Sequence, residues 1–471
     1  MGRIGKADFE ADILGALRRA YGAFVSGDLE AYAAGVRAAR SMYETKELVD
    51  DGLHGELLLV DALRLLGDAS ALLAAYRRAA DLLDGCSRVL PRGTPLFPAC
   101  YDPFVACFRE PGTADRVVDD LEACAKLHRR LVGGGAASFA PLLCRAQLAF
   151  YRGEVDAARE MTDRVQAALP RELADFASLA LVDLQLGIAK QESDLVVWKS
   201  GLARVTEVCE LASTIDKCIC QMAALVRMMN MFSVGIVEPV DHRMETGDFG
   251  VYPLGNGYGV VDGGLAYSVI PMAYLARVEY LSYRGNPAQA LLVADEAQKL
   301  CGIGGMIIYD AFLDFFRAGC WLQLSREQDA RACIDRAVDC IAPDYLWQIA
   351  AEFEPAFGEI LHESVLRYGD TALRTVCELG GGYWDRLRLV KDAEADDSLV
   401  GLLTSRELEV SRFAAQGLPN RQIAEQLVVS ERTVKYHLLN AYAKLKVNRR
   451  VNIRAALDKQ GPADTAWWMK N

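Results

Sequence analysis

The spacing of apolar residues constrains this chain more than any other feature of its sequence. Through residues 1–390, apolar side chains recur three and four positions apart, as they do at 58–66 and at 142–150. Because an α-helix turns once every 3.6 residues or so, this spacing puts them on one helical face. Strict alternation of apolar and polar residues, which would indicate strands, is absent. The sequence therefore predicts an all-α fold for this part of the chain.

A weak internal repeat runs through the same part. In four segments a helical run ends at glycine, an acid or amide follows as a helix cap, and alanine comes four or five places after the glycine. The segments begin at Gly27-Asp28, Gly67-Asp68, Gly153-Glu154 and Gly285-Asn286, and the alanines are Ala31, Ala71, Ala157, Ala158 and Ala290. Their separations are close to multiples of a period in the low forties, about the length of one helical hairpin. Small alanines are expected to let the helices approach closely.

These segments resemble tetratricopeptide-like repeats, most clearly from Tyr151 to Pro170. The leading Trp and the Leu-Gly pair of that repeat are mostly missing, and an irregular α-helical domain is the alternative. Either way, stacked hairpins present an extended concave surface suited to binding. We therefore expect residues 1–390 to sense a small-molecule or protein effector, and we expect no enzyme.

A glycine-rich stretch interrupts the helices at 247–264. Its seven glycines are interleaved with Phe249, Tyr252 and Tyr258. A phosphate-binding loop would need a following Lys-Ser or Lys-Thr, or a strand and a helix around the glycines, and neither is present. Two interpretations stay open: an ordinary long connection between hairpins, or an aromatic and glycine-rich loop that contacts a ligand or partner.

Composition excludes several classes of protein. With 52% hydrophobic and 25% charged residues, the chain is expected to fold rather than stay disordered. The longest uncharged stretches, 131–144 and 263–276, are 14 residues each, too short for a bilayer that needs about 20. Asp8, Glu10 and Asp12 interrupt the place where a secretion signal would need an apolar core. We expect a cytoplasmic protein with no membrane partner.

Cysteines and histidines give no support to a metal site. The 13 cysteines are an odd number without any CxxC pair, which is typical of reduced, mostly buried thiols. The five histidines lie far apart without HxH or HxxxH spacing, so a metal site would have to be assembled from distant parts of the chain. We therefore expect neither a metal nor another cofactor.

Charge divides the chain into two parts. The net charge is −12, yet residues 402–459 hold 11 basic and 5 acidic side chains, a net +6, which leaves −18 on residues 1–401. An acidic stretch containing Asp392, Glu394, Asp396 and Asp397 separates them. The predicted organisation is a helical domain at 1–390, a linker at 391–400, a basic domain at 401–459 and a tail at 460–471.

The basic domain carries the pattern of a helix-turn-helix. Thr404 and Glu407 form a capping box that starts one helix, which ends at Gly417. Asn420 is expected to cap a short second helix, and Ser430 a third. The apolar residues of the third helix follow a spacing of four, three and four: Val434, Leu438, Ala441 and Leu445. Two short helices and a longer one in this order make a helix-turn-helix.

At these positions the sequence resembles the LuxR-type (NarL/FixJ-like) DNA-binding domain, over about residues 402–457. The matching residues are Leu403, Thr404, Arg406, Glu407, Glu409, Val410, Gly417, Asn420, Ile423, Ala424, Leu427, Ser430, Thr433, Val434, Lys435, His437, Asn440, Lys444, Leu445, Val447 and Arg449. Ser411 and Ala414 depart from usual leucines, Lys446 from a usual glycine and Asn452 from a usual alanine. These departures concern the tightness of the core and the dimer contact of a fourth helix.

A helical wheel places a separate set of residues opposite the apolar face of the third helix. Arg432, Tyr436 and Leu439 lie there, with Thr433, Asn440 and Lys444 along one edge and Lys435 along the other. The resemblance implies base contacts from Lys435, Tyr436 and Leu439, and a small two-fold contact from a fourth helix. The predicted DNA-binding residues are Asn420, Arg421, Ser430, Arg432, Thr433, Lys435, Tyr436, Leu439, Asn440 and Lys444, and the predicted dimer contacts are Val451, Ile453 and Ala455.

Together these features predict a transcription regulator that binds double-stranded DNA as a homodimer through its C-terminal domain. The alternative is an interaction adaptor whose helix-turn-helix contacts other transcription components, which would show no salt-dependent DNA affinity.

Overall fold

The computed structural model describes most of the chain. The described residues are 6–26, 28–45, 50–97, 101–133, 140–169, 176–212, 217–236, 242–247, 260–261, 264–265, 269–300, 305–391, 403, 405–427, 429–445, 447, 449–450 and 452–454. Within them the fold is all-α apart from one two-stranded hairpin, which confirms the predicted class. No helix among these residues is long and apolar enough to cross a membrane.

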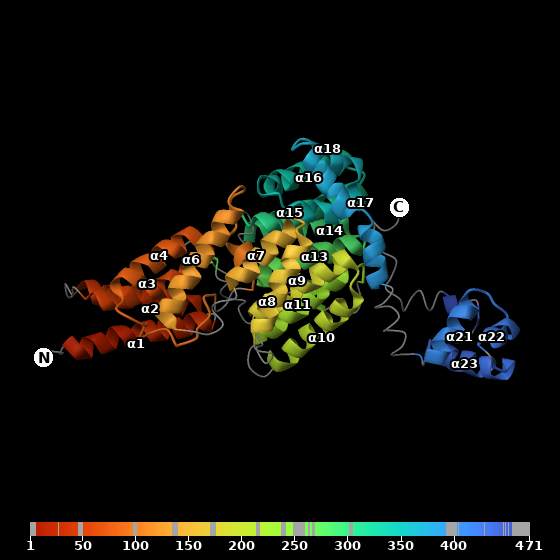
Figure 1. Cartoon of the computed structure of the whole chain (residues 1–471), viewed down its shortest axis with the longest axis horizontal. Helices are drawn as coiled ribbons and strands as arrows, with labels where there is room; N and C mark the ends of the chain where they lie inside the picture. The colour runs from red at the N-terminus through yellow and green to blue at the C-terminus, as the bar shows by residue number, and fades with distance from the viewer. Residues whose placement is uncertain are drawn as a thin grey trace.

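The body begins with six α-helices and one 3-10 helix, drawn from red to orange in Figure 1. They are α1 (Lys6–Val25), α2 (Leu29–Thr45), α3 (Asp51–Asp61), η1 (Ala62–Leu65), α4 (Ala69–Leu82), α5 (Pro103–Cys107) and α6 (Ala114–Val132), where η marks a 3-10 turn. The pairs α1 with α2 and α3 with α4 pack as hairpins. Asp344, which comes far later in the chain, accepts hydrogen bonds from the N–H groups of Gly112 and Ala114 at the start of α6. This contact ties the N-terminal helices to the rest of the body.

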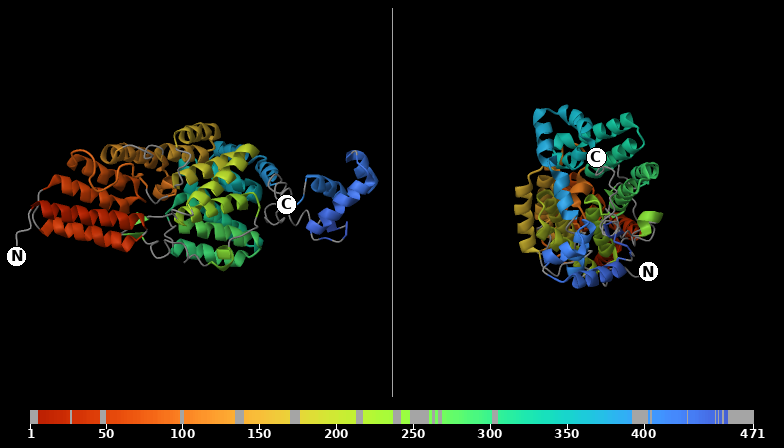
Figure 2. Two further views of the ribbon diagram at one scale, coloured as in Figure 1. Left: turned by 90° about the horizontal axis from the view of Figure 1, so that it is seen from below. Right: turned by 90° about the vertical axis from the view of Figure 1, so that its right-hand side faces the viewer.

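A second, larger group of helices follows, drawn from orange-yellow through green to light blue in Figure 1. It consists of α7 (Ala140–Tyr151), α8 (Val155–Ala168), α9 (Phe176–Glu192), α10 (Leu195–Ala212), α11 (Lys217–Ser233), α12 (His242–Thr246), α13 (Val269–Tyr283), α14 (Pro287–Leu300), α15 (Ile307–Gln323), α16 (Glu327–Ile341), η3 (Ala342–Asp344), α17 (Trp347–Phe357), α18 (Glu359–Leu366) and α19 (Asp370–Gly380). Residues 383–391 are also helical. Figure 2 shows this group from two further directions.

The odd-numbered helices from α7 to α17 form a closed ring. Helix α9 contacts α7 and α11, α13 contacts α11 and α15, and α17 contacts both α15 and α7. The even-numbered α8, α10, α14 and α16 each pair with a ring helix. Successive ring helices begin at residues 140, 176, 217, 269, 307 and 347, close to the period predicted from the sequence. The hairpin interpretation fits this arrangement, and the tetratricopeptide-like label stays a prediction.

The hairpin turns share one backbone motif. In the α7–α8 turn the N–H of Glu154 donates to the carbonyl of Ala149 five residues back, at 2.9 Å, after Gly153 with a φ of +85°. This is a Schellman end, in which a residue with positive φ reverses the chain and satisfies the last helical carbonyls. The α13–α14 turn repeats it with Gly285 at a φ of +72°.

The predicted caps and alanines are confirmed in part. Asp28 and Asp68 each accept a hydrogen bond from the backbone N–H three residues on, at 2.9 Å. Glu154 makes no side-chain cap, so that prediction is wrong. Its longer side chain differs from the short acids that suit this position. Ala158 and Ala290 are fully buried, as close packing of hairpins requires.

The glycine-rich stretch is described only in part. The strands β1 (Val260–Val261) and β2 (Gly264–Leu265) pair antiparallel, with Val260 opposite Leu265. Gly247 follows α12 with a φ of +73°. Most of the glycines and all three aromatic residues lie outside the described residues, so both interpretations of this stretch stay open.

The described residues bury two separate hydrophobic cores. One extends from Phe9 to Val390 and includes both groups of body helices. The other extends from Leu403 to Ile453. Residues 392–400, which hold most of the predicted linker, lie between them and outside the described residues. Lys391, the first residue of the predicted linker, still belongs to the helix described at 383–391.

Candidate functional site

The second core belongs to three helices at the C-terminal end of the chain. They are α21 (Ser405–Ala415), α22 (Asn420–Leu427) and α23 (Glu431–Lys444), blue in Figure 1. Each contacts the other two. Val410 of α21, Ile423 of α22 and Val434 of α23 are fully buried, so one residue from each helix meets at the centre. This is the arrangement that the apolar spacing predicts.

The first helix ends where the sequence predicts. Gly417 has a φ of +88°, and the N–H of Leu418 donates to the carbonyl of Phe413 at 3.1 Å, the Schellman motif again. The predicted cap at the other end, Thr404, lies outside the described residues. Its partner Glu407 is buried at 4% exposure.

The start of the second helix differs from the prediction. Asn420 is the first helical residue, and the carbonyl of Pro419 accepts the first helical hydrogen bond, from Ile423. The Asn420 side chain accepts a hydrogen bond from Nη1 of Arg450 at 2.5 Å, so Asn420 ties α22 to a later segment. Nη2 of Arg450 also donates to the carbonyl of Leu418. Sequence reasoning missed Arg450, whose partners lie 30 residues away.

The third helix confirms the predicted cap and core face. The Ser430 hydroxyl accepts from the N–H of Thr433 at 3.1 Å, which satisfies a free donor of the first turn. Val434, Leu438 and Ala441 are buried, and Leu445 follows them into the core. The opposite face of α23 is therefore free of the domain's own packing.

That opposite face presents the residues predicted to enter a DNA groove. Tyr436 and Leu439 are 62% and 65% exposed, although both are large and partly or wholly apolar. Arg432 and Lys435 are exposed beside them. The ring of Tyr436 meets the ring of His437 edge to face at 5.6 Å. Two cations and two large side chains thus gather on one side of a capped helix.

Other predicted contact residues have partners inside the domain. Lys444 forms an ion pair with Glu407 of α21, with Nζ to Oε2 at 2.6 Å. Thr433 shares a hydrogen bond of 2.7 Å with the Ser430 hydroxyl. Arg421 pairs with Glu425 on the exposed side of α22 at 3.2 Å. The Lys444 ion pair joins α23 to α21, whereas the other two contacts lie within a single helix or its cap.

Of the three predicted dimer-contact residues, the structure describes Ile453 alone. Ile453 is fully buried in the second core, so its side chain has no exposed surface to offer a second copy. Val451 and Ala455 lie outside the described residues. Ser411, one of the departures from the family pattern, is also fully buried, and its hydroxyl lacks a hydrogen-bond partner in the described structure.

The three helices and their caps define a helix-turn-helix domain. Residues 401–455 match the family of bacterial regulatory proteins called the luxR family, and this segment is a LuxR-family domain. A nitrate/nitrite response regulator homolog of Haemophilus influenzae is 46% identical over 63 residues, which are 13% of this chain and 30% of that protein.

Two further relatives also carry the names of regulators. The nitrate/nitrite response regulator NarP of Escherichia coli is 36% identical over 123 residues, 26% of this chain and 53% of NarP. A putative HTH-type transcriptional regulator of Mycobacterium bovis is 47% identical over 53 residues, 11% of this chain and 6% of that protein. The chain covers about half or less of the length of these relatives.

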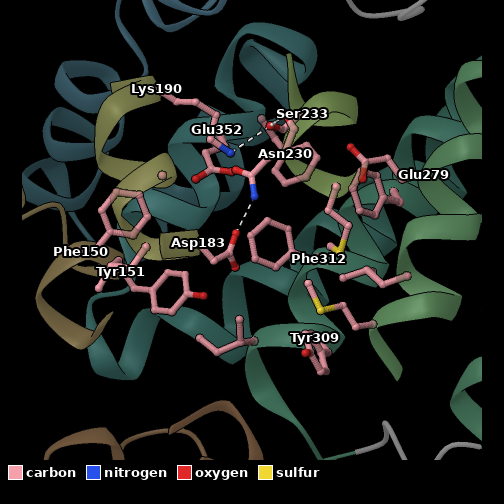
Figure 3. Close-up of a pocket in the computed structure, with 18 of the residues that line it drawn as sticks. Phe150, Tyr151, Asp183, Lys190, Asn230, Ser233, Glu279, Tyr309, Phe312 and Glu352 are labelled. Atoms are coloured by element: carbon pink, nitrogen blue, oxygen red, sulfur yellow. Dashed lines mark hydrogen bonds between the residues drawn. The ribbon is translucent and has the colours of Figure 1, made fainter. Parts of the chain in front are cut away.

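A second candidate site lies inside the body. A cavity of about 190 Å³ is lined by the ring helices α7, α9, α11, α13, α15 and α17, by α5 with the residues just before it, and by the helical residues 383–391 (Figure 3). The outer helices α8, α10, α14 and α16 contribute no lining residue. The ring therefore encloses a space on its inner side, where the sequence predicted only an open concave surface.

The described residues also bring together a small cluster that sequence spacing did not reveal. Glu354, His362 and Cys377, on α17, α18 and α19, have potential ligand atoms within 4.8 Å of one another. Nε2 of His362 lies 2.9 Å from Oε1 of Glu354 and 3.7 Å from Sγ of Cys377. Burial raises the pKa of the Cys377 thiol, which disfavours the thiolate that binds metals. The hydrogen bond of His362 to Glu354 already joins two of the three helices.

Proposed function

We propose that this protein is a cytoplasmic transcription regulator that binds double-stranded DNA through α23 and is controlled by its helical body. The observation that carries the proposal is the exposed face of α23, where Arg432, Lys435, Tyr436 and Leu439 project from a helix whose opposite face forms the domain core. A helix presented in this way fits the major groove of DNA. The regulator names of the relatives support the same interpretation.

The proposed contacts have different roles. Lys435 and Arg432 supply charge for phosphates or base edges, and Tyr436 and Leu439 supply apolar contact with bases or sugars. Arg421, Asn420, Ser430, Thr433, Asn440 and Lys444 are proposed to lie along the phosphate backbones or to hold the helices that do. Binding as a homodimer, with paired half-sites about one helical turn apart, also belongs to the proposal.

Lys435→Ala tests the placement of the DNA-facing side. The variant should keep the fold and lose one charge-assisted contact. If that contact is to a base, the binding free energy should weaken by about 1–3 kcal/mol. If it is to a phosphate, the slope of log affinity against log salt concentration should fall in magnitude by about 1. Fluorescence anisotropy with fragments selected from random DNA measures both. Lys299→Ala removes the same charge from an exposed position on α14 and should change neither. Unchanged DNA binding by Lys435→Ala would contradict the placement.

One observation also favours the adaptor interpretation. Tyr436 and Leu439 form an exposed pair of large side chains, and such pairs often mark protein contacts. An adaptor would show no salt-dependent DNA affinity, and it would lose its protein partner when Leu439 is changed to Lys. Selection from random DNA separates the two functions, because only a DNA-reading domain enriches a shared sequence.

Control by the body is the second half of the proposal. The body has its own core and a cavity, while the DNA-facing helix belongs to a different core. The helical residues 383–391 line that cavity and are followed directly by the segment that leads to the C-terminal domain. A ligand in the cavity would therefore contact the last described helix before the DNA-binding domain.

A further inference from the structure

The charge lining the cavity is strongly one-sided. Four carboxylates face it, from Asp102, Asp183, Glu279 and Glu352, and among the lining residues Lys190 is the one cationic side chain. Figure 3 shows Lys190 reaching toward the Ser233 hydroxyl, to which its ammonium donates at 2.9 Å. An anionic ligand would meet several carboxylates for a single ammonium, so the charge balance favours a positively charged one.

These carboxyl groups have few positively charged partners among the described residues. Burial raises the pKa of Asp102 to about 7, and the nearby charge of Asp183 adds to this. Burial likewise raises the pKa of Glu279 to about 8. Burial also raises the pKa of Glu352, and the charge of Lys190 offsets this in part. A bound cation would supply the missing charge and favour the ionised forms.

The polar groups at the cavity also offer acceptors. The amide of Gln147 donates to Oδ2 of Asp102 at 2.8 Å, while its carbonyl oxygen is buried without a hydrogen-bond partner in the described structure. Asp183 accepts from Tyr101 and from Asn230, at 2.6 Å each, and is thereby held in place. A ligand with N–H donors would satisfy the Gln147 carbonyl, which a purely apolar ligand would leave unpaired.

Aromatic rings make up much of the remaining wall. Phe150, Tyr151, Tyr309, Phe312, Phe353 and Trp384 line the same space. The faces of such rings attract cations and pack against apolar groups. A cavity of about 150 Å³ is enough for benzene, so a space of about 190 Å³ suits a compact ligand of roughly that size with a small charged group.

We infer that this cavity binds a small organic cation, a protonated or quaternary amine with a compact apolar part, and that it is the effector site of the body. The ammonium group would lie beside the buried carboxyl groups of the lining, and the apolar part against the aromatic rings. The effector role, unlike the binding itself, rests on the proposed function.

Shape-matched probes test the charge preference. Benzylamine, benzyl alcohol and benzoate share a ring and differ in charge, and isothermal titration calorimetry with the full chain measures their affinities. Benzylamine should bind at least about tenfold more tightly than either of the others, because only it supplies a cation to the buried carboxylates. Tighter binding of benzoate, or equal binding of all three, would overturn the inference. So would the absence of binding by benzylamine, benzyltrimethylammonium and other cations of this size at millimolar concentration.

Two substitutions in the lining, one that removes a negative charge and one that removes a positive charge, test whether the ligand binds in this cavity. Glu279→Gln keeps the shape but removes a carboxylate, and should weaken benzylamine by about tenfold or more. Lys190→Met removes a like charge and should leave benzylamine binding equal or tighter. Thermal melts of both variants establish that they fold. A reversed order, with Lys190→Met the weaker binder, would indicate an anion site instead.

A parallel DNA measurement separates this inference from the proposed function. Anisotropy of a selected DNA fragment is measured with and without benzylamine, for the wild-type chain and for Glu279→Gln. DNA binding without any binding of cations would overturn the cavity inference and leave the proposed function standing. Cation binding in a chain that binds no DNA would do the reverse. Both kinds of binding without mutual influence would remove the effector role alone.

Discussion

The buried Ser411 hydroxyl is the clearest weakness in the C-terminal core. Its side chain is fully buried and lacks a hydrogen-bond partner in the described structure. Ser411→Ala removes that unpaired group with little change in shape, so it should stabilise the domain by about 1 kcal/mol. Hydrogen exchange of the amides in α21 and α23 of the full chain reports this local stability.

Ser430→Ala is the matched control in the same domain. It deletes the cap of α23 and should lower the same stability by about 1 kcal/mol. Two identical substitutions are thus expected to have opposite signs. Destabilisation by both would mean that the Ser411 hydroxyl has a partner, such as a buried water.

Asp102 should make the stability of the body depend on pH. Its pKa is about 7 in the folded chain and near 3.8 when unfolded, so between these values the folded state holds a proton that the unfolded state has lost. The free energy of unfolding should therefore fall as pH rises through this window, by up to about 1.4 kcal/mol per pH unit. Above the folded pKa the slope from this residue disappears.

Asp102→Asn removes this titration and keeps the helix cap. An asparagine oxygen can still accept from the N–H of Val105, as Oδ1 of Asp102 does at 3.0 Å. Relative to wild type, the variant should gain stability steadily from about pH 5 to about pH 7. Paired thermal melts across this range measure the difference. A difference that stays constant with pH would show that Asp102 titrates normally in the folded chain.

At the scale of residues, the sequence predicted which side chains of α23 are buried and which are exposed. Val434, Leu438 and Ala441 follow from helical spacing, and Tyr436 and Leu439 follow as their opposite face. The ion pair of Lys444 with Glu407 could not be predicted in the same way. It depends on how two helices cross, which spacing within one helix does not contain.

At the scale of elements, two hairpin turns escaped the sequence analysis because serine stands where glycine was expected. Ser193 and Ser325 have φ values of +58° and +60°, in the position that Gly153 and Gly285 occupy elsewhere. The N–H of Arg326 completes the same Schellman motif with the carbonyl of Trp321, at 2.9 Å. A search for glycine finds only those turns in which glycine occupies the position of positive φ, and it misses the turns that use serine.

Ser325→Gly should therefore stabilise the α15–α16 turn. Glycine adopts a positive φ without the steric cost that serine has, so the free energy of unfolding should rise by about 0.5–1 kcal/mol. Ser200→Gly, on the exposed face of α10 with ordinary helical geometry, should lower it by a similar amount. Chemical denaturation of the full chain compares the two. If Ser325→Gly does not stabilise the chain, the turn is not strained.

The closed ring could not be predicted from the repeat. The hairpins and their period follow from apolar spacing and from turns such as Gly153-Glu154. Whether a row of hairpins stays open or closes depends on the small angle between neighbours, accumulated over the row. The contact of α17 with α7 that closes it lies between segments about 200 residues apart. For this reason the sequence analysis missed the cavity and the four acidic residues that distant segments contribute to it.

At the scale of the whole molecule, the opposite charges of the two parts predict restraint of DNA binding. The body holds −18 and the C-terminal domain +6. An acidic body close to a basic domain should repel phosphates. Residues 398–471 alone should therefore bind nonspecific DNA more tightly at low salt than the full chain does, and the difference should shrink as salt increases.

Paired half-sites provide the control for this prediction. If the main role of the body is dimerisation, the full chain should be the tighter binder of two half-sites, through the gain from linking two domains. Anisotropy of both proteins on single and paired sites, across a salt series, distinguishes these effects. A full chain that binds every DNA more tightly at every salt concentration would contradict restraint.

The contact between α17 and α7 also limits how this protein can change in evolution. An open row of hairpins can lengthen when one hairpin is duplicated, because the new unit adds to an end that already stacks on its neighbours. A ring has no such end, and an extra hairpin would separate α17 from α7 and break the wall of the cavity. The number of hairpins in the ring is therefore coupled to the size of the enclosed space. New ligand preferences should arise by substitution of lining residues rather than by gain or loss of repeats.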